Sequence, residues 1–209
     1  MEFKTKPYPF QYETCERSRD AFYYALFLSP GLGKSKIIID TAMYLYQQEK
    51  IYLLIIIAPK GLYENWNGEI KTHLGDISTN TVIWKSLQNL KLKIKLKGLM
   101  GSKFGIYNLD IFLGNIDMLS TKKGVLYLQE LLKQHGKNCL FVLDESTAIG
   151  NPKSIRTRTA IRLGQMAQYK RILTGTPIAD SILELPTQIQ FLGNLQDLLK
   201  TKNWYSFRN

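Results

Sequence analysis

The sequence has 209 residues, of which 44% are hydrophobic and 22% charged, which excludes a wholly disordered chain and predicts one sizeable core. We expect neither a secreted nor a membrane protein, because the N-terminus lacks the apolar core of a secretion signal and no apolar run approaches the ~20 residues that span a bilayer. The two cysteines are too few for a disulfide framework, so we expect the protein to be located in the cytoplasm. The net charge of +11 favours a polyanionic partner such as nucleic acid.

Strand and helix patterns alternate along the chain. In chain order, we expect a helix over residues 11–22, a strand over 24–28, a helix over 34–48, a strand over 51–58, a helix over 60–70, strands over 81–84 and 107–115, a helix over 125–135, a strand over 139–143, a helix over 154–168, a strand over 171–173 and a helical run over 181–192. Residues 51–58 are apolar on both faces, as in a covered parallel sheet. This order predicts an α/β fold with three layers and a mostly parallel central sheet of roughly six or seven strands.

Residues 91–97 alternate strictly between lysine and aliphatic residues. Period two predicts an amphipathic edge strand with four lysines on one face. A solvated basic helix or loop is an equal alternative, because glycines interrupt the pattern soon afterwards. In either case we expect residues 86–105 to form a peripheral basic insertion.

A glycine-rich stretch, residues 28–35, lies between the first predicted strand and the second predicted helix. Such a turn aims backbone N–H groups and a helix N-terminus at one point, which suits a polyphosphate. Lys34 would reach the β- and γ-phosphates, and the Ser35 hydroxyl would bind Mg²⁺. Leu28 stands where the general pattern has glycine, so an ordinary strand-to-helix turn is the alternative.

Two adjacent carboxylates, Asp144 and Glu145, follow the apolar strand predicted at 139–143. Ligands of an open parallel sheet bind outside the carboxyl ends of its strands, so these residues and the glycine-rich turn can face one crevice. Asp144 would hold Mg²⁺, usually through water, and Glu145 would activate the attacking water. The alternative is a polar loop start.

Basic residues are concentrated between residues 149 and 171, where six occur without an acidic residue. The six are Lys153, Arg156, Arg158, Arg162, Lys170 and Arg171. Such local excess attracts polyanions and releases their counterions, which indicates nucleic acid. For Arg156, Arg158 and Arg162, a solvated helix face is about as plausible as DNA contact.

The order of these motifs resembles the first RecA-like lobe of superfamily 2 helicases and translocases, in the Swi/Snf-type branch as it occurs in phage and bacterial proteins. The matching blocks are Gln11, Gly31-Leu32-Gly33-Lys34-Ser35, Ile57-Ala58-Pro59-Lys60 followed by Trp66, Asn115-Ile116-Asp117-Met118-Leu119-Ser120, Asp144-Glu145-Ser146 followed by Asn151-Pro152-Lys153-Ser154, and Leu173-Thr174-Gly175-Thr176-Pro177. The family commonly lacks the glycine that Leu28 replaces. Gly150 and Asp180 stand where the family commonly has lysine and asparagine.

The resemblance implies a DNA-dependent ATPase that uses ATP and Mg²⁺. Gln11 would read the adenine, and the nucleotide would also contact Pro30, Gly31, Leu32, Gly33, Lys34 and Ser35. Lys34, Asp144 and Glu145 would be catalytic, with Ser35 and Asp144 on the metal. Thr174, Gly175 and Thr176 would couple the nucleotide to the DNA surface. The backbone of duplex DNA would contact Lys60, Ser120, Thr121, Lys153 and Arg156, without base reading.

The resemblance also predicts the organisation of the chain. Residues 1–195 would form the first lobe, and residues 196–209 would begin the link to a second RecA-like lobe that is absent here. That lobe, in the same chain or in trans, would supply arginine fingers. We therefore expect the isolated chain to be nearly inactive, in a bacterial or phage-infected cell. A stand-alone, non-hydrolysing DNA-binding or partner-binding module is the alternative function.

Overall fold

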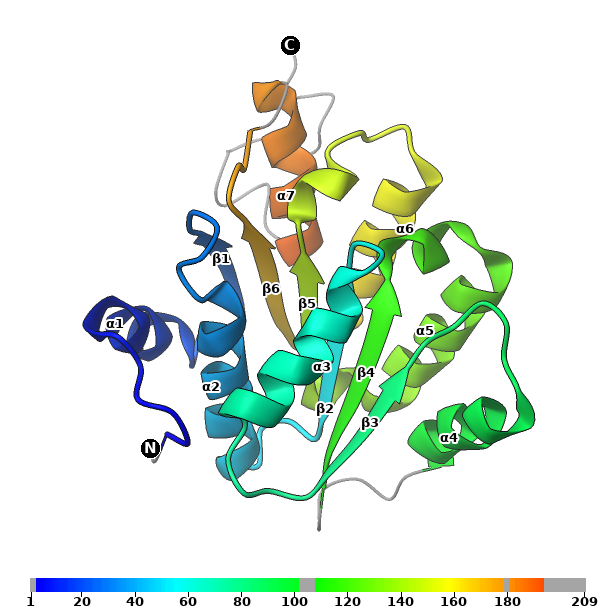
Figure 1. Cartoon of the computed structure of the whole chain (residues 1–209). Helices are drawn as coiled ribbons and strands as arrows, with labels where there is room; N and C mark the ends of the chain where they lie inside the picture. The colour runs from blue at the N-terminus through cyan, green and yellow to red at the C-terminus, as the bar shows by residue number, and fades with distance from the viewer. Residues whose placement is uncertain (1–2, 102–107, 179–180, 194–209) are drawn as a thin grey trace.

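A computed structural model describes residues 3–101, 108–178 and 181–193 of the chain. Within these ranges, six strands form one sheet in the order β1-β6-β5-β2-β4-β3, and every neighbouring pair is parallel (Figure 1). The strands are β1 (Tyr23–Phe27), β2 (Leu53–Ala58), β3 (Thr79–Ile83), β4 (Leu109–Asn115), β5 (Cys139–Asp144) and β6 (Tyr169–Thr174). The predicted α/β fold with a mostly parallel sheet is confirmed.

Helices cover both faces of this sheet, which gives the predicted three layers (Figure 1). One face carries α1 (Pro9–Ser18), α2 (Lys34–Gln47) and α3 (Leu62–His73), and the other carries α4 (Leu90–Gly101), α5 (Lys122–His135), α6 (Ile155–Gly164) and α7 (Leu185–Leu192). Short 3₁₀ turns are η1 (Ile116–Ser120), η2 (Gly136–Asn138), η3 (Ser146–Ile149) and η4 (Ile182–Glu184). The helical run predicted at 181–192 is thus η4 followed by α7.

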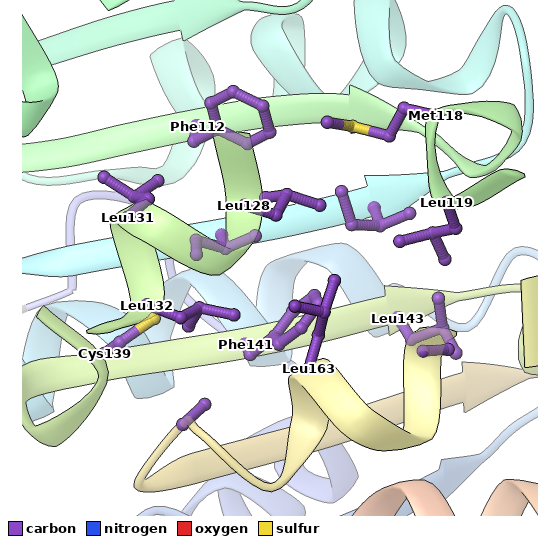
Figure 2. Close-up of a cluster of buried hydrophobic side chains, with 14 of the residues drawn as sticks. Phe112, Met118, Leu119, Leu128, Leu131, Leu132, Cys139, Phe141, Leu143 and Leu163 are labelled. Carbon is purple, nitrogen blue, oxygen red and sulfur yellow. The ribbon is translucent and has the colours of Figure 1, made fainter. Parts of the chain in front are cut away.

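Each face of the sheet has its own apolar core because alternate residues of a strand point to opposite faces. In β2, for example, Ile55 packs with α5 and α6, whereas Ile56 packs with α2 and α3. Figure 2 shows the first of these cores, in which side chains of α5 and α6 lie over β4 and β5; the labelled residues of these elements include Phe112, Leu128, Leu131, Leu132, Phe141 and Leu163. Burial on both faces explains why these strands are continuous apolar runs.

The lysine-rich segment at 91–97 is part of helix α4, so the edge-strand alternative is wrong and the helical alternative is confirmed. Leu92, Leu96 and Leu99 recur at helical spacing and pack against the core, while the four lysines are exposed. The two periodicities coexist in the sequence, and burial of the leucines decides between them. Helix α4 is the crossover between β3 and β4; residues 102–105 of the expected insertion lie outside the described residues.

Two of the six basic residues between 149 and 171 do not contribute to the surface charge. Lys170 is 8% exposed and Arg171 is fully buried in β6. The Arg171 guanidinium donates hydrogen bonds to the backbone oxygens of Ser18 (2.7 Å) and Lys170 (2.8 Å). Burial lowers the pKa of Arg171 to about 10. Arg171 therefore holds the end of α1 against the sheet, and the basic surface expected from the sequence loses these two charges.

Two further expectations concern the environment of the chain. Cys15 and Cys139 are both buried and free. No helix within the described ranges is long and apolar enough to cross a membrane. The proposed link at 196–209 lies outside the described residues.

Candidate nucleotide-binding site

The glycine-rich stretch is a loop between β1 and α2, as predicted. Gly31 and Gly33 have φ angles of +82° and +73°, a left-handed conformation that favours glycine. Gly33 is also the N-cap residue of α2, so the loop leads directly into a helix N-terminus. The Lys34 ammonium donates to the backbone oxygens of Leu28 (2.8 Å) and Ser29 (3.5 Å). This arrangement of glycines, helix start and lysine is suited to a phosphate chain.

Gln11 lies directly against this loop, although it is 22 positions away from Gly33 in the sequence. Its Nε2 donates to the backbone oxygen of Leu32 (3.2 Å), and its Oε1 accepts from the backbone N–H of Tyr8 (3.0 Å). A Cβ added to Gly33 would lie 2.3 Å from Gln11 Nε2, so a side chain there would displace the Gln11 amide, and the φ of +73° also disfavours any residue but glycine. Gln11 therefore fastens α1 to the loop, in addition to its predicted contact with adenine.

Asp144 ends β5 and Glu145 follows it, as predicted. The Asp144 carboxylate is held at both oxygens. The Trp66 indole N–H donates to Oδ2 (2.8 Å), and the backbone N–H of Glu145 donates to Oδ1 (2.9 Å). Burial raises the pKa of Asp144, whereas these two donors and the charge of Lys34 act in the opposite direction. The influence of Lys34 on Asp144 indicates that the loop and β5 share one electrostatic environment.

The Thr174-Gly175-Thr176 segment lies between the loop and the carboxylates because β6 lies between β1 and β5. Thr174 Oγ1 donates to Glu145 Oε2 (3.2 Å) and accepts from the backbone N–H of Thr176 (3.1 Å). Gly175 lies so close to Pro30 that an added Cβ would be 2.8 Å from its ring. Three motifs far apart in the sequence thus meet at one edge of the sheet.

Glu145 has a left-handed backbone conformation, with φ of +47° and ψ of +61°. This conformation is uncommon for a residue with a side chain and costs of order 1 kcal/mol. It directly precedes η3, and the side chain it carries accepts the hydrogen bond from Thr174. Strain of this kind is frequent where a functional side chain must be aimed.

A second group of predicted residues gathers at the carboxyl ends of β2 and β4, which are neighbours in the sheet. Lys60 and Thr121 line a cavity of about 310 Å³ together with Asn115, Asp117 and Lys123. Ser120 is exposed beside it. Thr121 caps α5, since its hydroxyl accepts from the Gly124 N–H at 3.1 Å. We call Lys60, Ser120, Thr121 and Lys123 the strand-end surface.

The two predicted contacts near α6 differ from each other. Lys153 is exposed, and its backbone N–H donates to Asn151 Oδ1 (2.9 Å). Arg156 forms an ion pair with Asp117 at 2.9 Å, so part of its charge is already neutralised. The pair joins the start of α6 to η1 and places Arg156 next to the strand-end surface.

The site contacts of three residues were not predicted from the sequence. Trp66 was named above only as part of the block that follows Lys60, with no role of its own, yet its indole N–H donates to Asp144. Lys123 lines the same cavity as Lys60, and its position in the first turn of a helix capped by Thr121 could have revealed it. Gln188 of α7 is fully buried, accepts from the Ser146 hydroxyl (2.6 Å) and donates to the Pro177 oxygen (2.7 Å). Gln188 thereby connects the segments that follow β5 and β6, and no local sequence signal indicates this.

Comparisons with known proteins agree with this geometry. A family model described as the SNF2-related domain matches residues 25–208. The chromatin-remodeling ATPase INO80 of Mycosarcoma maydis is 29% identical over 163 residues, which cover 78% of this chain and 8% of that protein. The INO80 ATPase of Arabidopsis thaliana is 27% identical over 166 residues, which cover 78% of this chain and 10% of that protein.

A solved structure has a similar fold. The Sulfolobus solfataricus SWI2/SNF2 ATPase core in complex with dsDNA matches with a TM-score of 0.69 and 21% identity, covering 91% of this chain and 36% of that chain. This chain therefore spans about a tenth of the two curated relatives and about a third of that core. Because the family model covers most of its length, the chain belongs to the SNF2-related domain family and is a RecA-like lobe of the Swi/Snf-type branch of superfamily 2 helicases.

Proposed function

We propose that the chain is the ATP-binding N-terminal motor lobe of a DNA-dependent ATPase that couples ATP hydrolysis to movement on duplex DNA. Residues 1–195 would be the first lobe, and residues 196–209 would begin the link to a second lobe, in the same chain or in trans. The related INO80 proteins are named as ATPases, and the Sulfolobus solfataricus core is in complex with dsDNA. These relations support the class of the reaction and of the partner.

The observation that carries the proposal is the connection from Pro30 through Gly175, Thr174 and Glu145 to Asp144. It joins the loop suited to phosphates to the carboxylate suited to a metal ion. The residues fit Mg-ATP, since the charge of Lys34 partly opposes the rise that burial causes in the pKa of Asp144, and the space beside Gly31 is open. When bound, Mg²⁺ neutralises charge that develops on the transferred phosphoryl group.

Each residue has a distinct role in this site. The backbone from Pro30 to Gly33 would donate N–H groups to phosphate oxygens, and the Lys34 ammonium would bind the β- and γ-phosphates. Ser35 and Asp144 would hold the metal ion, while Gln11 would bind the adenine. Glu145 would accept a proton from the attacking water, and its hydrogen bond from Thr174 orients it. The backbone N–H of Thr176 donates to Thr174, and Thr176 would transmit the nucleotide state of the site to the DNA surface.

The duplex would contact the strand-end surface, with Lys153 and Arg156 at its border. Lysines and a helix N-terminus bind phosphate groups without reading bases, so binding would be independent of sequence. Lys60, in the turn after β2, and Lys123, in the first turn of α5, line one cavity, which permits both to contact one phosphate backbone. The adjacent 3₁₀ turn η1 supplies Ser120.

Replacing Lys60 by alanine is expected to weaken duplex binding and to reduce the slope of log K against log salt by roughly one unit, because one phosphate contact is lost. Lys137→Ala is the matched control, since Lys137 is exposed at the opposite end of β5. Fluorescence anisotropy of a labelled duplex over a salt series measures both. Equal losses for the two variants would show that general charge, and not the strand-end surface, binds the duplex.

We expect the isolated chain to hydrolyse ATP very slowly, because a missing arginine finger costs roughly 10³ to 10⁵ in rate. Against a typical turnover of about 10 s⁻¹, the rate should be below about 0.01 s⁻¹. Phosphate release in the presence of duplex DNA is the measurement. Turnover at ordinary enzyme rates that Lys34→Ala abolishes would contradict the need for a second lobe.

A further inference from the structure

Trp66 combines a core position with a polar contact. The side chain is 2% exposed and packs on the face that carries α2 and α3. Its indole N–H nevertheless donates to Asp144 Oδ2 at 2.8 Å. Another aromatic ring could fill the same space, but only an indole carries an N–H donor at this point. The contact therefore serves more than packing.

The hydrogen bond restrains a carboxylate that accepts one other hydrogen bond from the described residues. Asp144 is 9% exposed, and Oδ1 accepts from the backbone N–H of Glu145. With Oδ2 bound to Trp66, both oxygens have a donor, so the plane of the carboxylate is fixed relative to the sheet. Each oxygen retains a further lone pair for another partner. Loss of the indole donor would free the carboxylate to rotate about its terminal bond.

The position of Trp66 in α3 connects this restraint to a second site. Helix α3 begins at Leu62, two residues after Lys60 of the strand-end surface, and Trp66 lies just over one turn inside it. Gly61, between Lys60 and Leu62, has a φ of +94° and is the N-cap residue. A shift of the Lys60 loop would move the first turns of α3 as a unit and carry the indole donor with it.

We propose that Trp66 is the positioning residue of Asp144 and that it transmits contact at Lys60 to the nucleotide site. The inference rests on the proposed function, because it takes the strand-end surface as the duplex contact. It adds a specific pair of atoms, Nε1 of Trp66 and Oδ2 of Asp144, through which one site acts on the other. Trp66 touches neither ligand and acts only through Asp144.

The indole ¹⁵N–¹H resonance of Trp66 tests the contact directly in the ligand-free chain. Trp66→Phe assigns this resonance among the three tryptophans. Asp144→Asn removes the charge of the acceptor and should shift the Trp66 resonance upfield while that of Trp84, which packs against Phe112 and Tyr127, stays in place. An unchanged Trp66 resonance would overturn the positioning role without any need for ATP.

Titration with duplex DNA tests the connection between the sites. The Trp66 resonance should move as the duplex binds, and Lys60→Ala at saturating duplex should abolish the movement. Duplex binding is measured in parallel by fluorescence anisotropy. A chain that binds no duplex would contradict the proposed function, and this outcome is distinguishable from a failure of the transmission. A bound duplex that leaves the Trp66 resonance in place would overturn the transmission.

Nucleotide binding gives an independent readout besides activity. Trp66→Phe keeps the ring but loses the donor, so the gain in affinity for a fluorescent ADP analogue on adding Mg²⁺ should fall about tenfold. Affinity in EDTA should be unchanged, as should both affinities in the control variant Trp84→Phe, which alters a buried indole in the other core. Equal losses with and without Mg²⁺ would show a structural role alone and would overturn the inference.

Discussion

Replacing Lys34 by alanine is expected to weaken the binding of Mg-ATP about 10- to 150-fold, because hydrogen bonds to charged groups contribute about 1.5–3 kcal/mol. Lys34 lies at the start of α2 and bonds to the loop oxygens of Leu28 and Ser29, so its ammonium is already held within the loop. The change removes the positive charge nearest the proposed phosphates. Equilibrium binding of a fluorescent ATP analogue is the measurement.

The control for this prediction is Lys71→Ala. Lys71 is an exposed lysine near the end of α3, away from the glycine-rich loop. It has the same charge as Lys34, so it corrects for the general effect of a +11 protein on an anionic ligand. Affinity lost equally in both variants would rule out the loop as the phosphate site.

Replacing Lys36 by methionine is expected to destabilise the fold by about 3–5 kcal/mol, since it leaves a buried carboxylate without its partner. The Lys36 ammonium donates to Asp40 Oδ1 (2.7 Å) and Oδ2 (2.5 Å), and both residues are 4% exposed. The ring of Phe3 lies 5.1 Å from the same ammonium. Denaturant unfolding followed by circular dichroism gives the free energy of unfolding.

An exposed ion pair, Lys50 and Asp20, is the control for this loss of folding stability. Lys50 bonds to Asp20 at 2.7 Å, but both side chains are more than a third exposed, so Lys50→Met should cost less than about 1 kcal/mol. Replacing Asp40 by leucine in the Lys36→Met chain should recover most of the lost stability. A Lys36→Met variant as stable as Lys50→Met would contradict the burial of the pair.

The loss in Lys36→Met should depend on pH. Burial raises the pKa of Asp40 even with Lys36 present. A carboxyl whose folded-state pKa is raised is favoured in its protonated form, so the contribution of this group to stability is largest at low pH and is lost as pH rises through that pKa. The destabilisation should therefore be smaller at about pH 5 than at about pH 8.

Much of the fold was predictable because the strands are buried on both faces. Continuous apolar runs such as β2 and β5 occur where a sheet is covered by helices, and the alternation with helical patterns fixes a parallel arrangement. The sequence could not decide between a strand and a helix for the segment that forms α4, since its lysines have period two and its leucines have helical spacing. Only burial of Leu96 and Leu99 distinguishes the two.

The candidate site was predictable where a motif follows a strand end. Residues 28–35, Asp144 and Thr174 each follow or end a strand, and the positions of β1, β6 and β5 in the sheet bring them together. The bond from Trp66 to Asp144 crosses 78 positions between two elements, and no local pattern encodes it. The burial of Arg171 likewise depends on the end of α1, so its charge seemed available for nucleic acid.

The most direct test is duplex DNA binding by the chain with and without a non-hydrolysable Mg-ATP analogue, in the wild type and in Lys34→Ala. A motor lobe couples its two sites, so the analogue should change duplex affinity in the wild type, and Lys34→Ala should remove that change while leaving nucleotide-free binding intact. Salt-dependent duplex binding that neither the analogue nor Lys34→Ala alters would contradict the motor lobe and identify a non-hydrolysing binding module.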